Sequence, residues 1–306
     1  MKDIIIIGAG PAGMTAALYA LRADKSVLLL EKENFGGQIT FSPRLENYPS
    51  IMEISGSEFA NQLLDQVVAH GAEIELAEAL EIKDMGEYKR VHTDYGDFDG
   101  KAVIIATGSK HRHLGLDGEE ELIGSGISFC AVCDGSFFAD KSVAVIGGGN
   151  TALQEAVMLS DICKKVTIIQ NLSFMTGEGR LLAILEKKNN VDMIFDTVLT
   201  GLEARDGELC AINIKNTKTD EEARFELDGM FVAIGQVPEN ESFKNVSALD
   251  PYGYIVSDEN CLTDTEGVFV AGDCRTKRIR QVTTASADGA VAALAACRYI
   301  DGLFAK

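Results

Sequence analysis

One pattern constrains the fold of this chain most strongly, and its first copy opens the sequence. An apolar strand is expected at residues 3–7, followed by the turn Gly8-Ala9-Gly10-Pro11-Ala12-Gly13 and a stretch with helical spacing at 14–22. The next strand, 26–30, leads directly into Glu31. Backbone amides at the start of such a helix can face a pyrophosphate, and a carboxylate after the second strand can accept hydrogen bonds from a ribose. The pattern predicts a dinucleotide site suited to the adenosine of FAD or NAD.

The same pattern returns in the middle of the chain. A strand is expected at 142–146, the turn Gly147-Gly148-Gly149-Asn150-Thr151-Ala152 follows, and a helix is expected at 153–159. The next strand, 165–169, leads into Gln170, at the same spacing from its glycine turn as the glutamate of the first copy. Two copies of one strand–turn–helix unit predict an α/β fold with two Rossmann-like dinucleotide-binding domains.

Just before the second copy stands the stretch Cys130-Ala131-Val132-Cys133-Asp134. Two thiols at this spacing can close a reversible disulfide that exchanges two electrons. Asp134 stands where an acid can give or take the proton that thiolate chemistry requires. Two other interpretations stay open on the residues alone: packed structural thiols, or a mixed zinc site that also uses His111 and His113.

The composition of the 306-residue chain favours a cytoplasmic α/β protein. Its 30 glycines against 5 prolines suit strand-to-helix turns. The cysteines do not form a secreted disulfide framework. Those outside the pair are expected to be packed thiols, namely Cys163, Cys210, Cys261, Cys274 and Cys297. The net charge of −19 argues against nucleic acid as a partner, and no apolar run is long enough for a membrane helix.

Four further short motifs are distributed along the chain. They are Gly36-Gly37-Gln38, Ala106-Thr107-Gly108, Gly267 to Asp273, and Arg280-Gln281. Together with the first glycine turn, Glu31 and a cysteine pair in the second domain, they closely resemble the low-molecular-weight thioredoxin reductases over essentially the whole chain. Larger related disulfide reductases carry their cysteine pair in the first domain. The resemblance implies a fold of the FAD/NAD(P)-linked disulfide reductase type.

The resemblance also implies a cofactor, partners and site residues. Thioredoxin is the expected substrate, and the protein is expected to be a homodimer. Cys133 is expected to face the flavin, Cys130 to exchange with thioredoxin and Asp134 to donate a proton. FAD is the expected cofactor, bound through Gly8, Gly10, Pro11, Ala12, Gly13, Glu31, Gly37, Gln38, Asn47, Ala106, Thr107, Gly108, Gly272, Asp273, Arg280 and Gln281.

The loop after the second copy departs from the family pattern. Members that use NADPH usually carry adjacent arginines there, whereas this chain has Gln170-Asn171-Leu172-Ser173, and Arg180 is the nearest cation downstream. An amide cannot replace the charge that binds a 2′-phosphate. The chain therefore resembles the ferredoxin-linked branch of the family, with reduced ferredoxin as the expected electron donor. Four cations between Arg275 and Arg280 are expected to form part of a docking edge for an acidic ferredoxin.

Two alternatives stay open. One is an NADPH- or NADH-dependent thioredoxin reductase, because Gln170 and Asn171 can still hydrogen-bond a ribose. The other, of a different class, is a flavin- or nucleotide-binding redox sensor with the cysteine pair as its latch. In each case we expect an FAD-binding domain at 1–112 plus 243–306 and an NAD(P)-type domain with the cysteine pair at 113–242.

Overall fold

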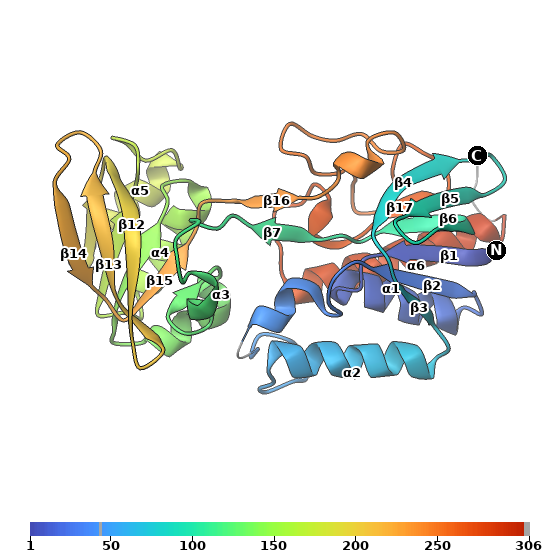
Figure 1. Ribbon diagram of the computed structural model, residues 1–306, viewed down its shortest axis with the longest axis horizontal. Helices are drawn as coiled ribbons and strands as arrows, with labels where there is room; N and C mark the ends of the chain where they lie inside the picture. The colour runs from blue at the N-terminus through green and yellow to red at the C-terminus, as the bar shows by residue number, and fades with distance from the viewer. Residues whose placement is uncertain (43–44, 303–306) are drawn as a thin grey trace. The chain divides into compact units, whose positions relative to one another are not determined.

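The structure, a computed structural model, describes residues 1–42 and 45–302 (Figure 1). The chain divides into two compact units: unit 1 is Met1–Lys110 with Val237–Lys306, and unit 2 is His111–Gln236. The two connections between them run through β7 (Ser109–His111) and β16 (Gln236–Pro238), which pair with each other. The domain boundaries expected after residues 112 and 242 lie slightly further along the chain than these divisions.

Unit 1 is built on a seven-stranded sheet in the order β3-β2-β1-β6-β5-β4, with β17 also paired to β6. The pairs among β1, β2, β3, β6 and β17 are parallel, whereas β5 and β4 continue the sheet in antiparallel pairs. The strands are β1 (Lys2–Ile7), β2 (Val27–Glu31), β3 (Glu73–Leu76), β4 (Ala79–Asp84), β5 (Lys89–Thr93), β6 (Asp97–Ile105) and β17 (Val268–Val270).

The core of unit 1 lies on both faces of this sheet. Ile4 and Ile6 of β1 face a cluster that includes α1 and α6, whereas Ile5 and Ile7 face a second cluster. Because successive side chains of a strand point to opposite faces, a strand buried on both sides reads as a continuous apolar run. The helices are α1 (Pro11–Arg22), α2 (Gly56–Ala69) and α6 (Val282–Ile300), with short 3₁₀ turns η1 (Gly37–Phe41), η4 (Glu241–Phe243) and η5 (Gly272–Cys274).

Unit 2 contains a five-stranded parallel sheet in the order β11-β10-β9-β15-β8. Its strands are β8 (Ile127–Ser128), β9 (Ser142–Ile146), β10 (Lys165–Ile169), β11 (Val191–Ile194) and β15 (Gly229–Val232). Its helices are α3 (Ala131–Asp134), α4 (Asn150–Ser160) and α5 (Gly179–Leu185), with 3₁₀ turns η2 (Glu120–Leu122) and η3 (Gly135–Phe138).

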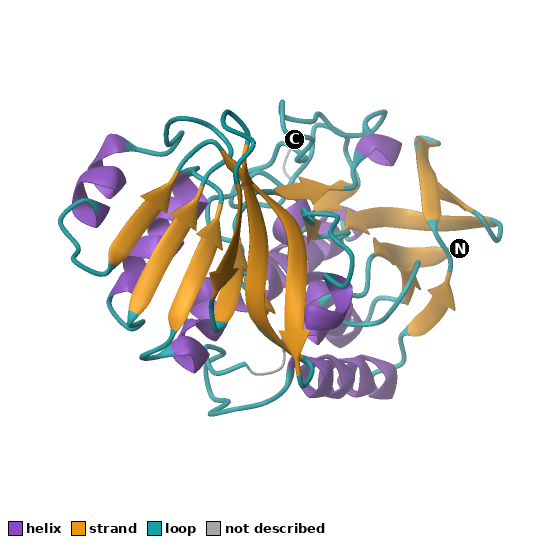
Figure 2. Cartoon of the chain, turned by 60° about the vertical axis from the view of Figure 1, so that its left-hand side comes forward, coloured by secondary structure: helices purple, strands orange, loops and turns teal. Residues whose placement is uncertain are grey.

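A separate three-stranded antiparallel sheet covers one face of the parallel sheet of unit 2. It consists of β12 (Thr197–Arg205), β13 (Glu208–Asn216) and β14 (Glu222–Glu226). Leu209, Ile212 and Ile214 of β13 pack with Ala144 and Ile146 of β9. The other face of β9 packs against α4, so the unit is layered as helices, parallel sheet and antiparallel sheet (Figure 2).

Both glycine turns open a helix at the carboxyl end of a central strand. Helix α1 starts at Pro11 after Gly10, and α4 starts at Asn150 after Gly149; each glycine is extended and neither helix has a side-chain cap. The first amides of both helices are therefore available to a ligand. The predicted α/β class with two Rossmann-like units is confirmed, although both helices begin three residues before their expected starts.

Candidate functional site

Cys130 and Cys133 are joined by a disulfide, with their Cα atoms 5.3 Å apart. Cys130 is the N-cap of α3, and its Sγ accepts a hydrogen bond from the backbone N–H of Cys133 at 3.2 Å. Both residues are half-buried. Among the described residues, no group of three or more His, Cys, Asp or Glu side chains is arranged to hold a metal. The structure therefore joins the two thiols to each other at the start of a short helix.

Asp134 is held beside the disulfide by the end of β8. The Oγ of Ser128 donates to Oδ2 of Asp134 at 2.6 Å and accepts the N–H of Cys130 at 3.1 Å. Within the described part of the chain, Oδ1 of Asp134 is buried and has no hydrogen-bond partner. Burial raises the pKa of Asp134, and the bond from Ser128 only partly offsets this effect. A carboxyl group in this state keeps its proton to higher pH, as a proton donor requires.

The five cysteines outside the pair are free thiols. Four are buried and Cys210 is half-buried. Burial raises the pKa of Cys163 to about 11 and that of Cys261 to about 12. Because the thiolate is the reactive form, burial disfavours reaction at Cys163 and Cys261, as expected for packed thiols.

The first glycine turn is tightly packed on one side and open on the other. Gly8 has a φ of +104°, and a Cβ there would overlap the carbonyl oxygen of Ala106. A Cβ at Gly13 would overlap the carbonyl oxygen of Gly8, so the helix packs directly on the turn. At Gly10, in contrast, a Cβ would meet only the carbonyl oxygen of Gly36, 3.9 Å away. The turn is closed on its protein side and open beside Gly10, at the start of α1.

Glu31 lies at the end of β2 against this turn. Its Oε2 accepts the N–H of Ala9 at 2.8 Å, and its Oε1 accepts the N–H groups of Lys32 and Glu33 at 2.8 and 2.9 Å. A carboxylate has about four acceptor positions, so one remains for a ribose hydroxyl. The carboxylate of Glu31 therefore lies against the first glycine turn with one acceptor position free of the hydrogen bonds described.

Asp273 on η5 has a buried carboxylate oxygen, Oδ1, which lies 3.7 Å from Nζ of Lys277. Its Oδ1 makes no hydrogen bond within the described residues, and burial raises the pKa of Asp273 to about 6. An unsatisfied buried oxygen marks a place where a polar ligand atom fits. A Cβ at the neighbouring Gly272, whose φ is +81°, would lie 2.7 Å from the Cβ of Ala12, so η5 adjoins the glycine turn.

The remaining expected cofactor residues come from several segments of unit 1. Gly37 begins η1, and a Cβ there would lie 3.5 Å from the Cα of Gly10. A Cβ at Gly108, with a φ of +69°, would meet no atom within 4 Å. Asn47 donates to Oε1 of Gln281 at 3.2 Å. Arg280 donates to the carbonyl oxygen of Asp273, and its guanidinium lies over the ring of Tyr254. Gln38 lies on η1, and Thr107 follows β6.

The docking edge expected at Arg275 to Arg280 is wrong for two of its four cations. The side chain of Arg275 is only 4% exposed, and that of Lys277 only 8%. Arg275 donates to both carboxylate oxygens of Asp288 on α6, at 2.9 and 2.8 Å, and Nζ of Lys277 donates to Oδ2 at 2.9 Å. These cations face inward because Asp288 is buried and requires their charge. In this run, Arg278 is exposed and Arg280 is half-buried.

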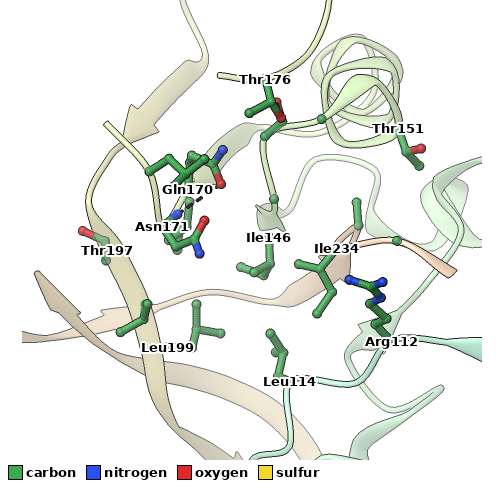
Figure 3. A pocket seen from close by; sticks show the side chains of 18 of the residues that line it. Arg112, Leu114, Ile146, Thr151, Gln170, Asn171, Thr176, Thr197, Leu199 and Ile234 are labelled. Atoms are coloured by element: carbon green, nitrogen blue, oxygen red, sulfur yellow. Dashed lines mark hydrogen bonds between the residues drawn. The ribbon is translucent and has the colours of Figure 1, made fainter. Parts of the chain in front are cut away.

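A cavity of about 650 Å³ lies at the second glycine turn (Figure 3). Gln170 and Asn171 lie on one side of it and Arg112 on the other. Gln170 is buried and uses its own amide locally: Nε2 donates to the carbonyl oxygen of Phe174 at 3.2 Å, and Oε1 accepts the N–H of Asn171 at 3.1 Å. Of the described residues that line the cavity, Arg112 is the one arginine or lysine.

Two residues near these sites did not stand out in the sequence. Arg112 was hidden in a segment that reads as a linker. Glu155 on α4 accepts the N–H of Ala131, between the two cysteines, at 3.4 Å. A single acid in a helical stretch carries no sequence signal of such a contact.

Comparisons with known proteins agree with this geometry. Residues 2–289 match the family model "Pyridine nucleotide-disulphide oxidoreductase". A thioredoxin reductase of Bacillus subtilis (strain 168) is 38% identical over 301 residues, which cover 98% of this chain and 95% of that protein. A Clostridium pasteurianum protein described as "34.2 kDa protein in rubredoxin operon" is 40% identical over 301 residues, 98% of this chain and 97% of its own. The crystal structure of thioredoxin reductase from Streptococcus pyogenes MGAS5005 has a TM-score of 0.94 at 37% identity, covering 99% of both chains.

A two-unit Rossmann-like fold with a disulfide in its second unit defines a disulfide oxidoreductase. The chain belongs to the pyridine nucleotide-disulphide oxidoreductase family, and within it to the low-molecular-weight thioredoxin reductases. These enzymes use FAD. Among the described residues, no helix is long and apolar enough to cross a membrane.

The open space beside Gly10 gives a test of the cofactor cradle. Gly10→Ala is expected to leave the fold intact, because the backbone there (φ −77°, ψ −178°) suits alanine, yet its methyl group would enter the space for the pyrophosphate. We expect FAD affinity to fall roughly 100-fold, or about 2.7 kcal/mol. Flavin absorbance after gel filtration, with thermal melting of the apoprotein, measures both effects. Gly179→Ala is the matched control, since a Cβ there meets no atom within 4 Å. Equal FAD retention by both variants would place the pyrophosphate elsewhere.

Proposed function

We propose that this protein reduces the disulfide of thioredoxin, passing electrons from FAD through the Cys130–Cys133 disulfide. The observation that carries the proposal is this disulfide, placed beside a buried acid in unit 2 of a chain whose unit 1 retains an open dinucleotide cradle. When bound, FAD supplies the two electrons that reduce a disulfide. In this proposal the catalytic residues are Cys130, Cys133 and Asp134.

The residues that hold FAD are proposed from the geometry of unit 1. The α1 amides and the open side of Gly10 receive the pyrophosphate, and the remaining acceptor position of Glu31 receives a ribose hydroxyl. Oδ1 of Asp273, which makes no hydrogen bond within the described residues, accepts from a hydroxyl group further along the cofactor. The proposed set also contains Gly8, Pro11, Ala12, Gly13, Gly37, Gln38, Asn47, Ala106, Thr107, Gly108, Gly272, Arg280 and Gln281.

The exchange with thioredoxin then needs only this chain's own groups. Reduction of the Cys130–Cys133 disulfide takes up two electrons and two protons and leaves two thiols. The Cys130 thiolate attacks one sulfur of the thioredoxin disulfide, which breaks, and a mixed disulfide forms. Cys133 then attacks Sγ of Cys130, releases reduced thioredoxin and restores the disulfide. Asp134 supplies a proton to a departing thiolate.

We propose reduced ferredoxin as the electron donor. The 2′-phosphate of NADPH binds near the end of the second strand, where this chain has Gln170 and Asn171 and no cation. Arg112 lies on the other side of the cavity, and Arg180 is 74% exposed and paired with Glu178. The Gln170 loop therefore lacks the positive charge that would select NADPH.

NADH is the second candidate donor, and the cavity favours it. A Cβ at Gly149 would meet only Oγ1 of Thr176, 3.8 Å away, so this turn is as open as the first. Gln170 retains one donor and one acceptor position for a ribose, because its amide makes one bond through each atom. NADH carries no 2′-phosphate and needs no cation at this loop.

The donor is tested by mixing the oxidised protein anaerobically with reduced ferredoxin, NADPH or NADH and following the flavin absorption band. We expect ferredoxin to bleach the band and both nucleotides to leave it unchanged. Bleaching by NADH would favour the second candidate, and bleaching by NADPH would contradict the role given to the Gln170 loop. Oxidised thioredoxin added afterwards should restore the band; a band that stays bleached would favour a redox sensor instead.

We also propose that the enzyme acts in the cytoplasm as a homodimer, with neither nucleic acid nor a membrane as partner. The net charge of −19 supports the absence of a nucleic-acid partner, since phosphate backbones would be repelled. The homodimer and the location rest on the family resemblance.

A further inference from the structure

Two buried carboxyl groups lie against the short helix α3, which carries the redox disulfide. Asp134 ends this helix, and Glu155 reaches its first amide from α4, accepting the N–H of Ala131 at 3.4 Å. Each carboxyl group has one oxygen, Oδ1 of Asp134 and Oε2 of Glu155, that is buried and lacks a hydrogen-bond partner among the described residues. Two such groups are unusual, because buried polar atoms are nearly always satisfied.

No cation neutralises Glu155 from the elements packed around it. Helix α4 packs against α3, α5, β9 and β10. Arg180 on α5 pairs with Glu178, Lys165 on β10 pairs with Asp192, and β9 carries no charged residue. Burial and the charge of Asp134 raise the pKa of Glu155 to about 7, although the N–H of Ala131 acts in the opposite direction. Near neutral pH this carboxyl group is therefore divided between its protonated and ionised forms.

We propose that Glu155 is a positioning residue of the redox centre, which shares a proton with Asp134 and so keeps the Asp134 carboxyl protonated during thiol–disulfide exchange. The inference rests on the proposed function as a thioredoxin-disulfide reductase. The two carboxyl groups act as one unit in which a single proton is favoured, because two negative charges in a buried site repel each other.

The proton balance of the exchange shows where this unit acts. Two protons leave the Cys130 and Cys133 thiols as their disulfide re-forms, and two are taken up by the sulfurs of thioredoxin. No proton is gained or lost overall, but each must be held while the sulfurs exchange partners. Asp134 gives the one proton that it shares with Glu155 to a departing thiolate. The proton that leaves the attacking thiol then restores the pair.

The first test measures the redox potential of the Cys130–Cys133 pair against pH in dithiol/disulfide buffers, with Glu155→Gln and the control Glu186→Gln. Glutamine keeps an oxygen for the N–H of Ala131 but cannot carry the proton, and Glu186 is an exposed acid after α5. Because Glu155 is coupled to the redox centre, its pKa should differ between the oxidised and the reduced protein, so wild type and Glu186→Gln should show a change of slope near pH 7. Glu155→Gln should lose that change. Equal slopes in all three proteins would overturn the proposal, and so would a wild-type slope with no change near pH 7.

The second test measures the rate of exchange between the prereduced enzyme and thioredoxin as a function of pH. Glu155→Gln should slow it about 10-fold, less than the roughly 100-fold or more that loss of a direct acid–base catalyst costs, and should remove the inflection near pH 7. Adding Glu155→Gln to Asp134→Asn should slow exchange no further, because Glu155 acts through Asp134. Additive losses would overturn the proposal. Failure of the wild type to reduce thioredoxin would refute the proposed function instead, while the redox titration, which needs no thioredoxin, still decides the role of Glu155.

Discussion

Replacing Cys133 by serine is expected to abolish thioredoxin turnover and to accumulate a covalent complex with thioredoxin through Cys130. Cys130 remains half-buried at the N-cap of α3 and can still attack a disulfide, but no second thiol is left to release the product. Turnover should fall by a factor on the order of 10³ or more, as when a nucleophile is removed. Non-reducing gels and intact mass measurement detect the complex.

The controls for this experiment lie within the chain. Cys130→Ser should be equally inactive but form no complex, and Cys163→Ser should behave as wild type because burial keeps that thiol protonated. Equal trapping by Cys130→Ser would reverse the roles given to the two sulfurs. Normal turnover by Cys130→Ser or by Cys133→Ser would show that the disulfide is not needed for the reduction of thioredoxin.

Asp288→Ala is expected to destabilise the fold of unit 1 strongly. It leaves the buried side chain of Arg275 without its carboxylate partner and takes from Lys277 the nearer of its two carboxylates. It also removes the acceptor of the Gly272 N–H, which lies 3.1 Å from Oδ2. Breaking a buried ion pair by removing one member costs roughly 3–5 kcal/mol. Because η5 would lose its anchor, we also expect FAD to be lost. Thermal melting and flavin release measure these effects.

The difference in stability between wild type and Asp288→Ala depends on pH with a defined sign. Burial by itself raises the pKa of Asp288, but the bonds from Arg275 and Lys277 outweigh it, so the pKa is lowered. A lowered pKa contributes stability above the ordinary pKa of aspartate, and this stability is lost as the pH falls through the lowered value. Wild type and Asp288→Ala should therefore converge in acid. Asp301→Ala, which removes an exposed partner of Lys25 after the same helix, should cost less than about 1 kcal/mol; an equal loss from both variants would contradict the anchoring role.

The parallel core of each unit could be predicted from the sequence because its signals are local. The strands expected at 142–146 and 165–169 have those bounds in the structure, since uninterrupted apolar runs end at a glycine turn or a polar residue. Gly8 and Gly13 could be identified for the same reason: strand, turn and helix must pack without a side chain between them.

Features that depend on contacts distant in sequence could not be predicted in this way. The antiparallel sheet β12–β14 was not predicted from the sequence. The side chains on its two faces are buried unevenly, so the alternation of apolar and polar residues along its strands is weak. Arg275 and Lys277 were expected on the surface. Their partner Asp288, which draws them inward, lies further along the chain on α6, so the local sequence does not show the pairing. The hydrogen bond from the N–H of Ala131 to Glu155 likewise joins two residues whose neighbours in sequence do not predict a contact.

The central claim, electron transfer from the Cys130–Cys133 pair to thioredoxin, is tested most directly by a single turnover. Enzyme reduced by one equivalent of electron pairs is mixed anaerobically with an equal amount of oxidised thioredoxin, and free thiols are alkylated and located by mass spectrometry at successive times. Our account predicts that alkylation disappears from Cys130 and Cys133 while it appears on the thioredoxin pair at the same rate. Reduced thioredoxin formed while Cys130 and Cys133 stay alkylated, or thioredoxin that stays oxidised, would contradict it.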